Sequence, residues 1–191
     1  MKPRILGIIP ARYASTRFPA KPLADIAGKS MIRRVYEQCQ KSEWLTDVVV
    51  ATDHAKIMAE VASFGGKSVM TAENHPSGTD RCFEALQLSG KYDFAINIQG
   101  DEPFIQPNQI DLLAEKLQDP SVQIATLVNE ITQSEEIMNP NVVKALIGQN
   151  SNAIYFSRSP IPYIRGEQAE NWLEKHTFYR HLGIYAFRTD G

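Results

Sequence analysis

Short apolar runs alternate with amphipathic helical patterns over the first 120 residues, and this alternation limits the possible folds most strongly. The runs cover residues 5–9, 48–51, 68–70 and 94–98, and helical spacing of apolar residues covers 31–39, 57–62, 79–89 and 107–118. Strands separated by helices form βαβ units, whose parallel strands are buried on both faces and are therefore apolar throughout. The pattern predicts an α/β fold with a parallel sheet covered by helices on both faces.

The second helix has the clearest predicted ends. Asp53 precedes it as an expected N-cap, and Gly65-Gly66 is expected to stop it. From residue 122 the pattern changes, since 123–128, 142–147, 153–156 and 182–187 are strand candidates with little helix between them. This indicates antiparallel strands added to the sheet or a small β-rich extension. One α/β domain over residues 1–191 is the simplest interpretation.

Composition narrows the function classes. Lys and Arg number 20 against 22 Asp and Glu, so the formal net charge is −2, whereas a nucleic-acid binder usually has a basic face. No run approaches the roughly 20 apolar residues that span a bilayer. Cys39 and Cys82 lie among apolar neighbours and are interpreted as reduced core residues. We therefore expect an intracellular protein that binds neither nucleic acid nor membrane.

The loop after the first strand carries three cations and no acid: Arg12, Arg17 and Lys21. It follows the carboxyl end of a parallel strand, which is the edge where open α/β sheets bind ligands. Guanidinium and ammonium groups on a proline-rich loop suit a polyphosphate. The same residues are compatible with a solvated basic loop, and neither a P-loop nor a dinucleotide-binding glycine pattern is present.

A carboxylate follows the fourth strand in the segment from Gln99 to Pro103. Asp101 there would reach the same sheet edge, and Mg²⁺ is usually held by one or two carboxylates together with substrate phosphates. Glu102 points elsewhere in an extended segment, so Asp101 alone is the favoured metal ligand. A turn carboxylate that caps the following helix is the alternative.

Two further segments carry polar groups but are weaker signals. Residues 77–81 open the third helix and could receive a polar ligand edge, although a plain capping motif is more usual. Arg158 and the pair Arg180-His181 lie at strand ends, where an Arg could bind a carboxylate but is more often ordinary surface. The four histidines lack paired zinc spacing, and no nucleophile elbow is present, which disfavours zinc and serine hydrolases.

Taken together, eight segments resemble the 3-deoxy-manno-octulosonate (Kdo) cytidylyltransferase family, also called CMP-Kdo synthetases. They occur in the family's order and span essentially the whole chain. The segments are IIPARYASTR (8–17), KPL (21–23), ATD (51–53), SGTDR (77–81), NIQGDEP (97–103), NPN (139–141), YFSR (155–158) and RHLGIY (180–185).

The resemblance implies a nucleotidyltransferase with a glycosyltransferase-A-like, Rossmann-like α/β fold and a mostly parallel mixed sheet. It implies an enzyme that converts CTP and Kdo to CMP-Kdo and pyrophosphate for lipopolysaccharide biosynthesis in the cytoplasm. It also implies a homodimer, with residues after about 122 serving substrate binding or dimerisation. A cytidylyltransferase for another acidic sugar, such as a sialic acid or 8-amino Kdo, and a truncated, inactive nucleotide-binding module remain alternatives.

Site residues follow from the resemblance position by position. Arg12, Arg17 and Lys21 would hold the triphosphate, and Asp101 would bind the cofactor Mg²⁺. The nucleotide would be framed by Pro10, Ala11, Ser77, Gly78, Thr79, Arg81 and Gln99. The sugar acid would contact Arg158, His181 and Tyr185, with Arg158 toward its carboxylate.

The chain departs from the family in two places. Ala20 stands where the family usually has Gly, so a positive φ there would be modestly strained. The family also continues beyond residue 191, into a helix lined with Glu and Leu and a Val-Asp-Thr-type segment whose Asp is a second Mg²⁺ ligand. The expectation is therefore that the C-terminal part of the fold is missing or that half the metal site is lacking.

Overall fold

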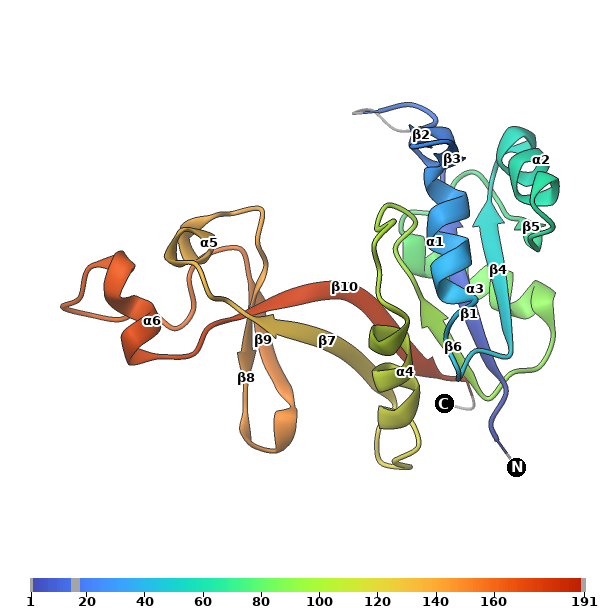
Figure 1. Cartoon of the computed structure of the whole chain (residues 1–191). Helices are drawn as coiled ribbons and strands as arrows, with labels where there is room; N and C mark the ends of the chain where they lie inside the picture. Colours follow the sequence, from blue (N-terminus) through green and yellow to red (C-terminus); the bar gives the residue numbers. More distant parts are fainter. Residues whose placement is uncertain (1, 15–17, 190–191) are drawn as a thin grey trace. The chain divides into compact units, whose positions relative to one another are not determined.

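A computed structural model describes residues 2–14 and 18–189. The chain divides into two compact units (Figure 1). The first contains the chain up to Ala125 and again from Ile184, and the second contains Thr126–Gly183.

The first unit is built on parallel strands. They are β1 (Ile5–Ala11), β4 (Asp47–Thr52), β5 (Ser68–Met70) and β6 (Phe94–Asn97), in the spatial order β5-β4-β1-β6. The last residues of β10 (Tyr179–Arg188) pair antiparallel with β6, Tyr185 opposite Asn97. The sheet is therefore mixed and mostly parallel, as predicted.

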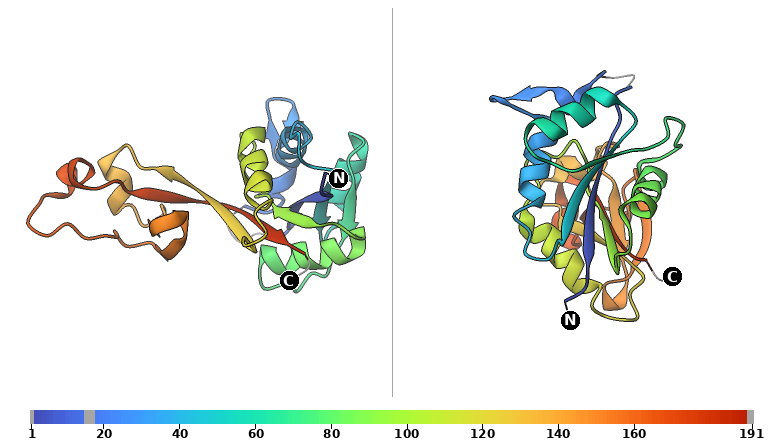
Figure 2. Two further views of the ribbon diagram at one scale, coloured as in Figure 1. Left: turned by 90° about the horizontal axis from the view of Figure 1, so that it is seen from below. Right: turned by 90° about the vertical axis from the view of Figure 1, so that its right-hand side faces the viewer.

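Helices cover both faces of these strands (Figure 2). They are α1 (Met31–Cys39), α2 (Ala55–Ser63), α3 (Gly78–Ser89) and α4 (Pro107–Lys116). On one face, Cys82 and Ala85 of α3 pack against Leu6, Ile8 and Val49. Alternate strand residues point the other way, where α1 and α4 contact each other and the sheet, so the strands are buried on both sides.

Helix starts agree with sequence chemistry except at one cap. The predicted N-cap Asp53 is wrong, because the residue that caps α2 is His54, whose Nδ1 accepts the backbone N–H of Lys56 at 3.2 Å. The carboxylate of Asp53 instead makes buried contacts described below. Ser77 caps α3 through an accepted N–H of Asp80 at 3.2 Å.

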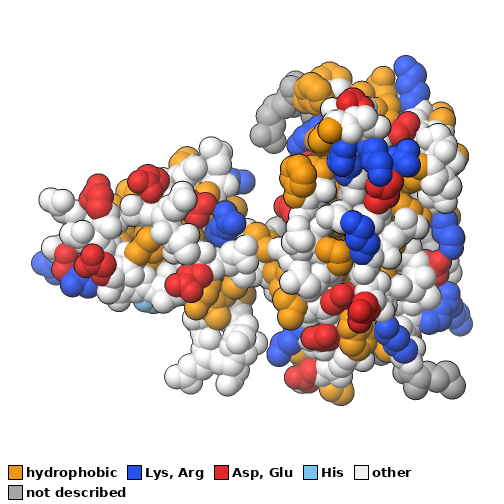
Figure 3. Space-filling view, in the orientation of Figure 1, with side chains coloured by type: hydrophobic (Ala, Val, Ile, Leu, Met, Phe, Trp, Pro, Cys, Tyr) orange, Lys and Arg blue, Asp and Glu red, His pale blue; other side chains and the backbone are white. Residues whose placement is uncertain are grey.

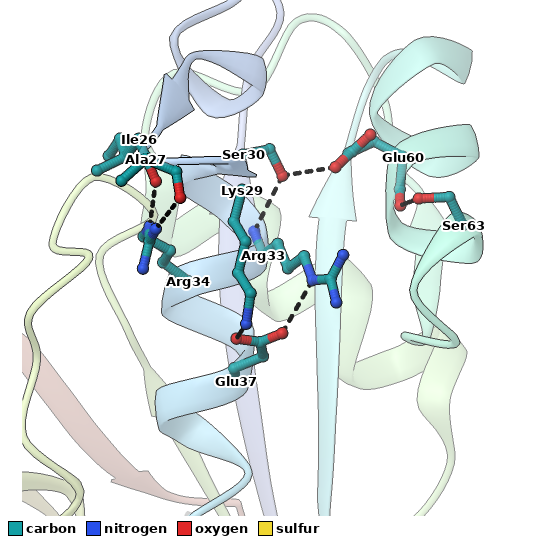
Figure 4. Close-up of polar contacts among 9 residues, drawn as sticks. All are labelled: Ile26, Ala27, Lys29, Ser30, Arg33, Arg34, Glu37, Glu60 and Ser63. Carbon is teal, nitrogen blue, oxygen red and sulfur yellow. Dashed lines mark hydrogen bonds and ion pairs between the residues drawn. The ribbon is translucent and has the colours of Figure 1, made fainter.

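A small hairpin continues the cationic loop. The elements are the 3-10 turn η1 (Lys21–Leu23) and strands β2 (Asp25–Ile26) and β3 (Lys29–Ser30). Basic side chains gather over the start of α1 beside this hairpin (Figure 3). Figure 4 shows how the hairpin is held. Arg34 of α1 donates to the carbonyls of Ile26 and Ala27 at 2.6 and 2.8 Å, and Ser30 of the hairpin donates to Glu60 of α2 at 2.6 Å. The hairpin that follows Lys21 is thereby fastened to both helices.

The second unit is rich in antiparallel strands with little helix. Strand β10 pairs with β8 (Lys144–Ile147), β8 pairs with β9 (Ala153–Ser157), and β7 (Ile124–Glu130) pairs with β10. Its helical pieces are α5 (Ser134–Met138), η2 (Gln149–Ser151), η3 (Ala169–Asn171) and α6 (Trp172–Lys175). Its core cluster is formed by Ile131, Ile137, Trp172 and Phe178. The change of pattern predicted after residue 122 is thus confirmed.

Two further expectations concern thiols and membrane segments. Cys39 and Cys82 are free and buried, and burial raises the pKa of each thiol to about 12. Within residues 2–14 and 18–189, no helix has the length and apolar character needed to cross a bilayer.

Candidate active site

A cavity of about 460 Å³ opens at the carboxyl ends of β1 and β6. It lies at the ligand-binding edge expected of an open α/β sheet. It is lined by Pro10, Ala11, Arg12, Ala14, Lys21, Pro22, Gly78, Gln99, Gly100 and Asp101. Seven of these are sequence-predicted site residues from four of the motif segments: Pro10, Ala11, Arg12, Lys21, Gly78, Gln99 and Asp101.

Gly100 allows the two sides of this cavity to meet. Strands β1 and β6 are neighbours, with Ile8 opposite Asn97, so the chain after β6 passes directly beside the end of β1. A Cβ at Gly100 would lie only 2.7 Å from the carbonyl oxygen of Pro10. Any other residue would push the Asp101 segment away from the cationic loop, which makes glycine a steric requirement here.

Lys21 and Asp101 face each other in the cavity. The Lys21 Nζ donates to Asp101 Oδ2 at 2.6 Å, with 41% and 50% of the two side chains exposed. An ion pair this accessible contributes about 0–1 kcal/mol to stability because water screens it. The pair therefore does little for the fold, and both groups are available to a ligand that carries negative charge and a divalent cation.

Arg12 approaches the cavity with an oriented guanidinium. Its Nη2 donates to the backbone carbonyl of His75 at 2.9 Å, in the segment that leads into α3. The His75 ring contacts the Glu84 carboxylate, which also accepts the N–H of Ala72 at 2.9 Å. These contacts hold the His75 segment to α3. They therefore fix the position of the His75 carbonyl, which accepts the hydrogen bond from Arg12. Arg17, the third predicted phosphate ligand, lies outside the described residues.

The departure at Ala20 has the expected conformation. Ala20 has φ 55° and ψ 25°, in the left-handed region that glycine adopts without strain. Its N–H donates to the carbonyl of Tyr13 at 2.9 Å, which closes the loop just before Lys21. The strain predicted for Ala20 is therefore present in the structure.

Arg81 takes a different position from the one predicted for it. Its side chain is 0% exposed, and it donates to Asp53 Oδ2 at 2.9 Å and to Thr71 Oγ1 at 2.5 Å. Among the described residues, no group forms a hydrogen bond with the buried Nε of Arg81. Asp53 Oδ1 in turn accepts the N–H of Tyr13 at 3.2 Å. Arg81 therefore binds together the ends of β4, β5 and the cationic loop rather than lining the cavity.

The other two members of the α3 motif also lie away from the cavity lining. Ser77 caps the helix, and Thr79 lines a separate apolar pocket of about 210 Å³ beside Cys82 and Asn97. Gly78 is the member of the motif that lines the cavity, where its Cα faces the ring of Pro10.

The predicted sugar-acid residues fall in both units. Arg158 and His181 lie in the second unit and Tyr185 in the first. Arg158 is exposed and donates to the carbonyl of Pro140 at 2.9 Å. The His181 Nε2 lies 2.9 Å from Thr126 Oγ1, and burial lowers the pKa of the imidazole. Burial raises the pKa of the Tyr185 hydroxyl.

The sequence motifs do not identify Gly100, which lines the cavity, or Asp53 and the His75 carbonyl, which support its walls. The sequence predicts Asp53 as a helix cap, yet Asp53 follows a buried strand directly, which is the signal that identifies Asp101. Gly100 stands next to that carboxylate, where a close backbone approach could have been suspected. The His75 carbonyl gave no signal, because a backbone acceptor is invisible in side-chain chemistry.

The donor set of the cavity fits Mg²⁺. Within the described ranges, no group of three His, Cys, Asp or Glu side chains could hold a metal unaided. Mg²⁺ commonly takes one or two carboxylates and completes its octahedral shell with phosphate oxygens and water. Asp101, half exposed in a cavity beside Arg12 and Lys21, could supply the carboxylate, and the cavity has room and positive charge for phosphates.

Comparison with known proteins identifies the family. A cytidylyltransferase family model matches residues 6–190. The 3-deoxy-manno-octulosonate cytidylyltransferase of Cytophaga hutchinsonii is 56% identical over 188 residues, which cover 97% of this chain and 75% of the relative. The chain belongs to the 3-deoxy-manno-octulosonate cytidylyltransferase family. The enzyme of the same name from Bacteroides thetaiotaomicron is 53% identical, covering 98% of this chain and 76% of the relative.

A solved structure supports the same assignment. A CMP:2-keto-3-deoxy-manno-octonic acid synthetase complexed with CTP aligns with a TM-score of 0.90 and 42% identity, over 98% of this chain and 75% of that one. The nucleotidyltransferase fold and the cytidylyltransferase family expected from the sequence motifs are therefore confirmed.

Proposed function

We propose that this chain transfers CMP from CTP to Kdo, giving CMP-Kdo and pyrophosphate for lipopolysaccharide synthesis in the cytoplasm. The observation that carries the proposal is the cavity that joins Arg12 and Lys21 to Asp101. Family membership supports the choice of CTP and Kdo, because the relatives act on Kdo by name and the solved neighbour is complexed with CTP.

The reaction exchanges one phosphorus–oxygen bond for another. The anomeric hydroxyl of the sugar acid attacks the α-phosphorus, the bond from that phosphorus to the oxygen that bridges it to the β-phosphate breaks, and the hydroxyl proton passes to water. Charge develops on the departing pyrophosphate, so cations placed around it stabilise the transition state. In this chain, Arg12 and Lys21 supply those cations. Gly78 and Gln99 line the same cavity and would contact the nucleoside.

Asp101 would hold Mg²⁺, which when bound would neutralise phosphate charge and orient the triphosphate. In the structure the Asp101 carboxylate forms an ion pair with Lys21. We propose that Lys21 turns from Asp101 to the phosphates when the nucleotide enters. After this exchange Lys21 would pair with the phosphates and Asp101 with Mg²⁺. Neither charged side chain would then lack a partner in the cavity.

A second copy of the chain is the proposed partner. Three consecutive residues of β9 are exposed although they are large and apolar: Ile154 at 64%, Tyr155 at 58% and Phe156 at 38%. An exposed apolar strand favours pairing with another chain. This supports the homodimer implied by the family, built through the second unit.

Replacing Asp101 tests the proposal. We expect Asp101→Ala to lower the rate of pyrophosphate release from CTP and Kdo by at least about 100-fold. The substitution removes the carboxylate that would hold Mg²⁺, and with it one contact that stabilises charge in the transition state. Pyrophosphatase-coupled malachite green measures the rate, and 8-amino Kdo and sialic acid are assayed in parallel to test sugar choice. Thermal unfolding should barely change, because the Lys21–Asp101 pair is exposed.

Asp119→Ala is the matched control, since this exposed carboxylate accepts from Ser121 in the loop after α4 and lies away from the cavity. Undiminished turnover in Asp101→Ala would remove the metal role from Asp101. Binding of CTP to the unaltered chain without turnover, with Mg²⁺ and Kdo present, would instead indicate a nucleotide-binding module.

A further inference from the structure

The second unit buries a lysine without a counter-ion. Lys144, the first residue of β8, is 0% exposed. In the described part of the chain no carboxylate forms an ion pair with it, whereas the nearby Arg180 pairs with Glu136 at 3.0 Å. Burying an ammonium group without a counter-charge is unfavourable, and an apolar side chain of similar size avoids that cost. Stability alone therefore does not explain a lysine at this position.

Lys144 is satisfied by backbone oxygens. Its Nζ donates to the carbonyl of Asn139 at 2.9 Å and to that of Val142 at 2.6 Å. Asn139 closes the same segment through its side chain, which accepts the N–H of Asn141 at 2.9 Å. Burial and the positive charge of Arg158 both lower the pKa of the lysine. The ammonium thus fastens residues 139–142 into one fixed turn.

Both sugar-acid residues of the second unit bind to this turn or its continuation. Arg158 Nη1 donates to the carbonyl of Pro140 at 2.9 Å. The backbone N–H of His181 donates to the carbonyl of Val143 at 2.8 Å. Strand register gives the same neighbourhood, because Lys144 pairs with Ser157 on one side and with Arg180 on the other, each the residue before a predicted ligand.

We propose that Lys144 is a positioning residue for the sugar-acid carboxylate. It orders the Asn139–Val143 segment, which aims the Arg158 guanidinium and fixes the His181 backbone. Its charge adds to the positive potential that an anion would meet at Arg158. The charged groups beside Lys144 are Arg158, whose positive charge acts on it, and the Arg180–Glu136 pair, whose Arg180 lies opposite it in the sheet. The inference rests on the proposed function, since it assigns Lys144 to binding of the sugar acid.

The test is direct binding by calorimetry, which needs no turnover. We expect Lys144→Met to raise the Kd for Kdo about tenfold, equivalent to about 1.4 kcal/mol. The Kd for CTP should not change, because the nucleotide cavity lies within the first unit. The Kdo methyl ester lacks the carboxylate charge, so Lys144→Met should weaken its binding much less than it weakens the binding of Kdo. A purely structural defect would weaken both sugars equally.

Two variants complete the design. Lys175→Met, at an exposed lysine of the same unit, should bind Kdo as the unaltered chain does. Lys144→Gln keeps an N–H donor for the turn and is used if Lys144→Met melts early; it should retain part of the Kdo affinity. Equal Kdo affinity in Lys144→Met and the unaltered chain would overturn the positioning role alone. Absence of Kdo binding to the unaltered chain would overturn the proposed function as well.

Discussion

Among the residues that the structure describes, each unit buries one cation completely, and the two cations differ in what holds them. In the first unit, Arg81 is paired with a carboxylate, Asp53, whose side chain is only 8% exposed. In the second, Lys144 is held by neutral backbone carbonyls. A buried charge that is paired with an opposite charge helps to hold the fold. Removing either member leaves the other buried without a counter-charge, which is strongly destabilising. A buried charge held only by dipoles leaves no unpaired charge behind when it is removed, only neutral carbonyls that lose a donor.

The difference matches what surrounds each cation. Arg81 and Asp53 tie α3 and the ends of β4 and β5 to the loop at Tyr13, so they support the walls of the cavity that Arg12, Lys21 and Asp101 line. Lys144 orders a single turn, and the Pro140 carbonyl of that turn accepts a hydrogen bond from Arg158. We therefore expect changes at Arg81 to affect the folding of the unit first, and changes at Lys144 to affect ligand binding first.

The largest expected effect is at Arg81. Arg81→Met leaves the Asp53 carboxylate buried with one backbone N–H as its remaining donor, which should cost about 3–5 kcal/mol of unfolding free energy. Urea denaturation followed by circular dichroism measures the change. Arg33→Met, which breaks a partly exposed pair with Glu37, is the control and should cost less than about 1 kcal/mol. A cost at Arg81 no greater than that of the control would contradict the framework role.

An intermediate effect is expected when the counter-charge alone is removed. Asp53→Asn leaves Arg81 facing a neutral amide, which imitates the setting of Lys144. The amide can serve Arg81 or the N–H of Tyr13 through its one oxygen, so we expect a loss of about 1.5–3 kcal/mol in the same urea assay. The Kd for CTP should rise in parallel, because Tyr13 belongs to the cationic loop. A loss as large as that of Arg81→Met would show that charge, rather than hydrogen bonding, dominates the contact.

The sequence predicted most of the framework and part of the site for identifiable reasons. Continuous apolar runs located the parallel strands, and the change of pattern near residue 122 located the β-rich part. Gly at the family position marked Ala20 as a left-handed residue, which the structure confirms. In each case a local rule and the tertiary structure agree.

The remainder depended on contacts between distant segments. Arg81 and Asp53 are 28 positions apart, and no local pattern says that a helix arginine will turn inward to a strand end. Lys144 stood in an apolar strand candidate and gave no functional signal, because its partners are backbone carbonyls. Motif matching placed Arg81 among nucleotide ligands, whereas burial assigns it to the support beneath the cavity.

The smallest effect on stability is expected at Lys144. Lys144→Met removes two charge-assisted hydrogen bonds but also removes the cost of burying the ammonium group, and these contributions nearly cancel. We expect the unfolding free energy to change by less than about 1 kcal/mol, while Kdo binding weakens as described above. Urea denaturation of Lys144→Met and Arg81→Met under the same conditions makes the comparison. A loss at Lys144 as large as that at Arg81 would mean that both buried cations are framework elements, and the contrast between the two units would disappear.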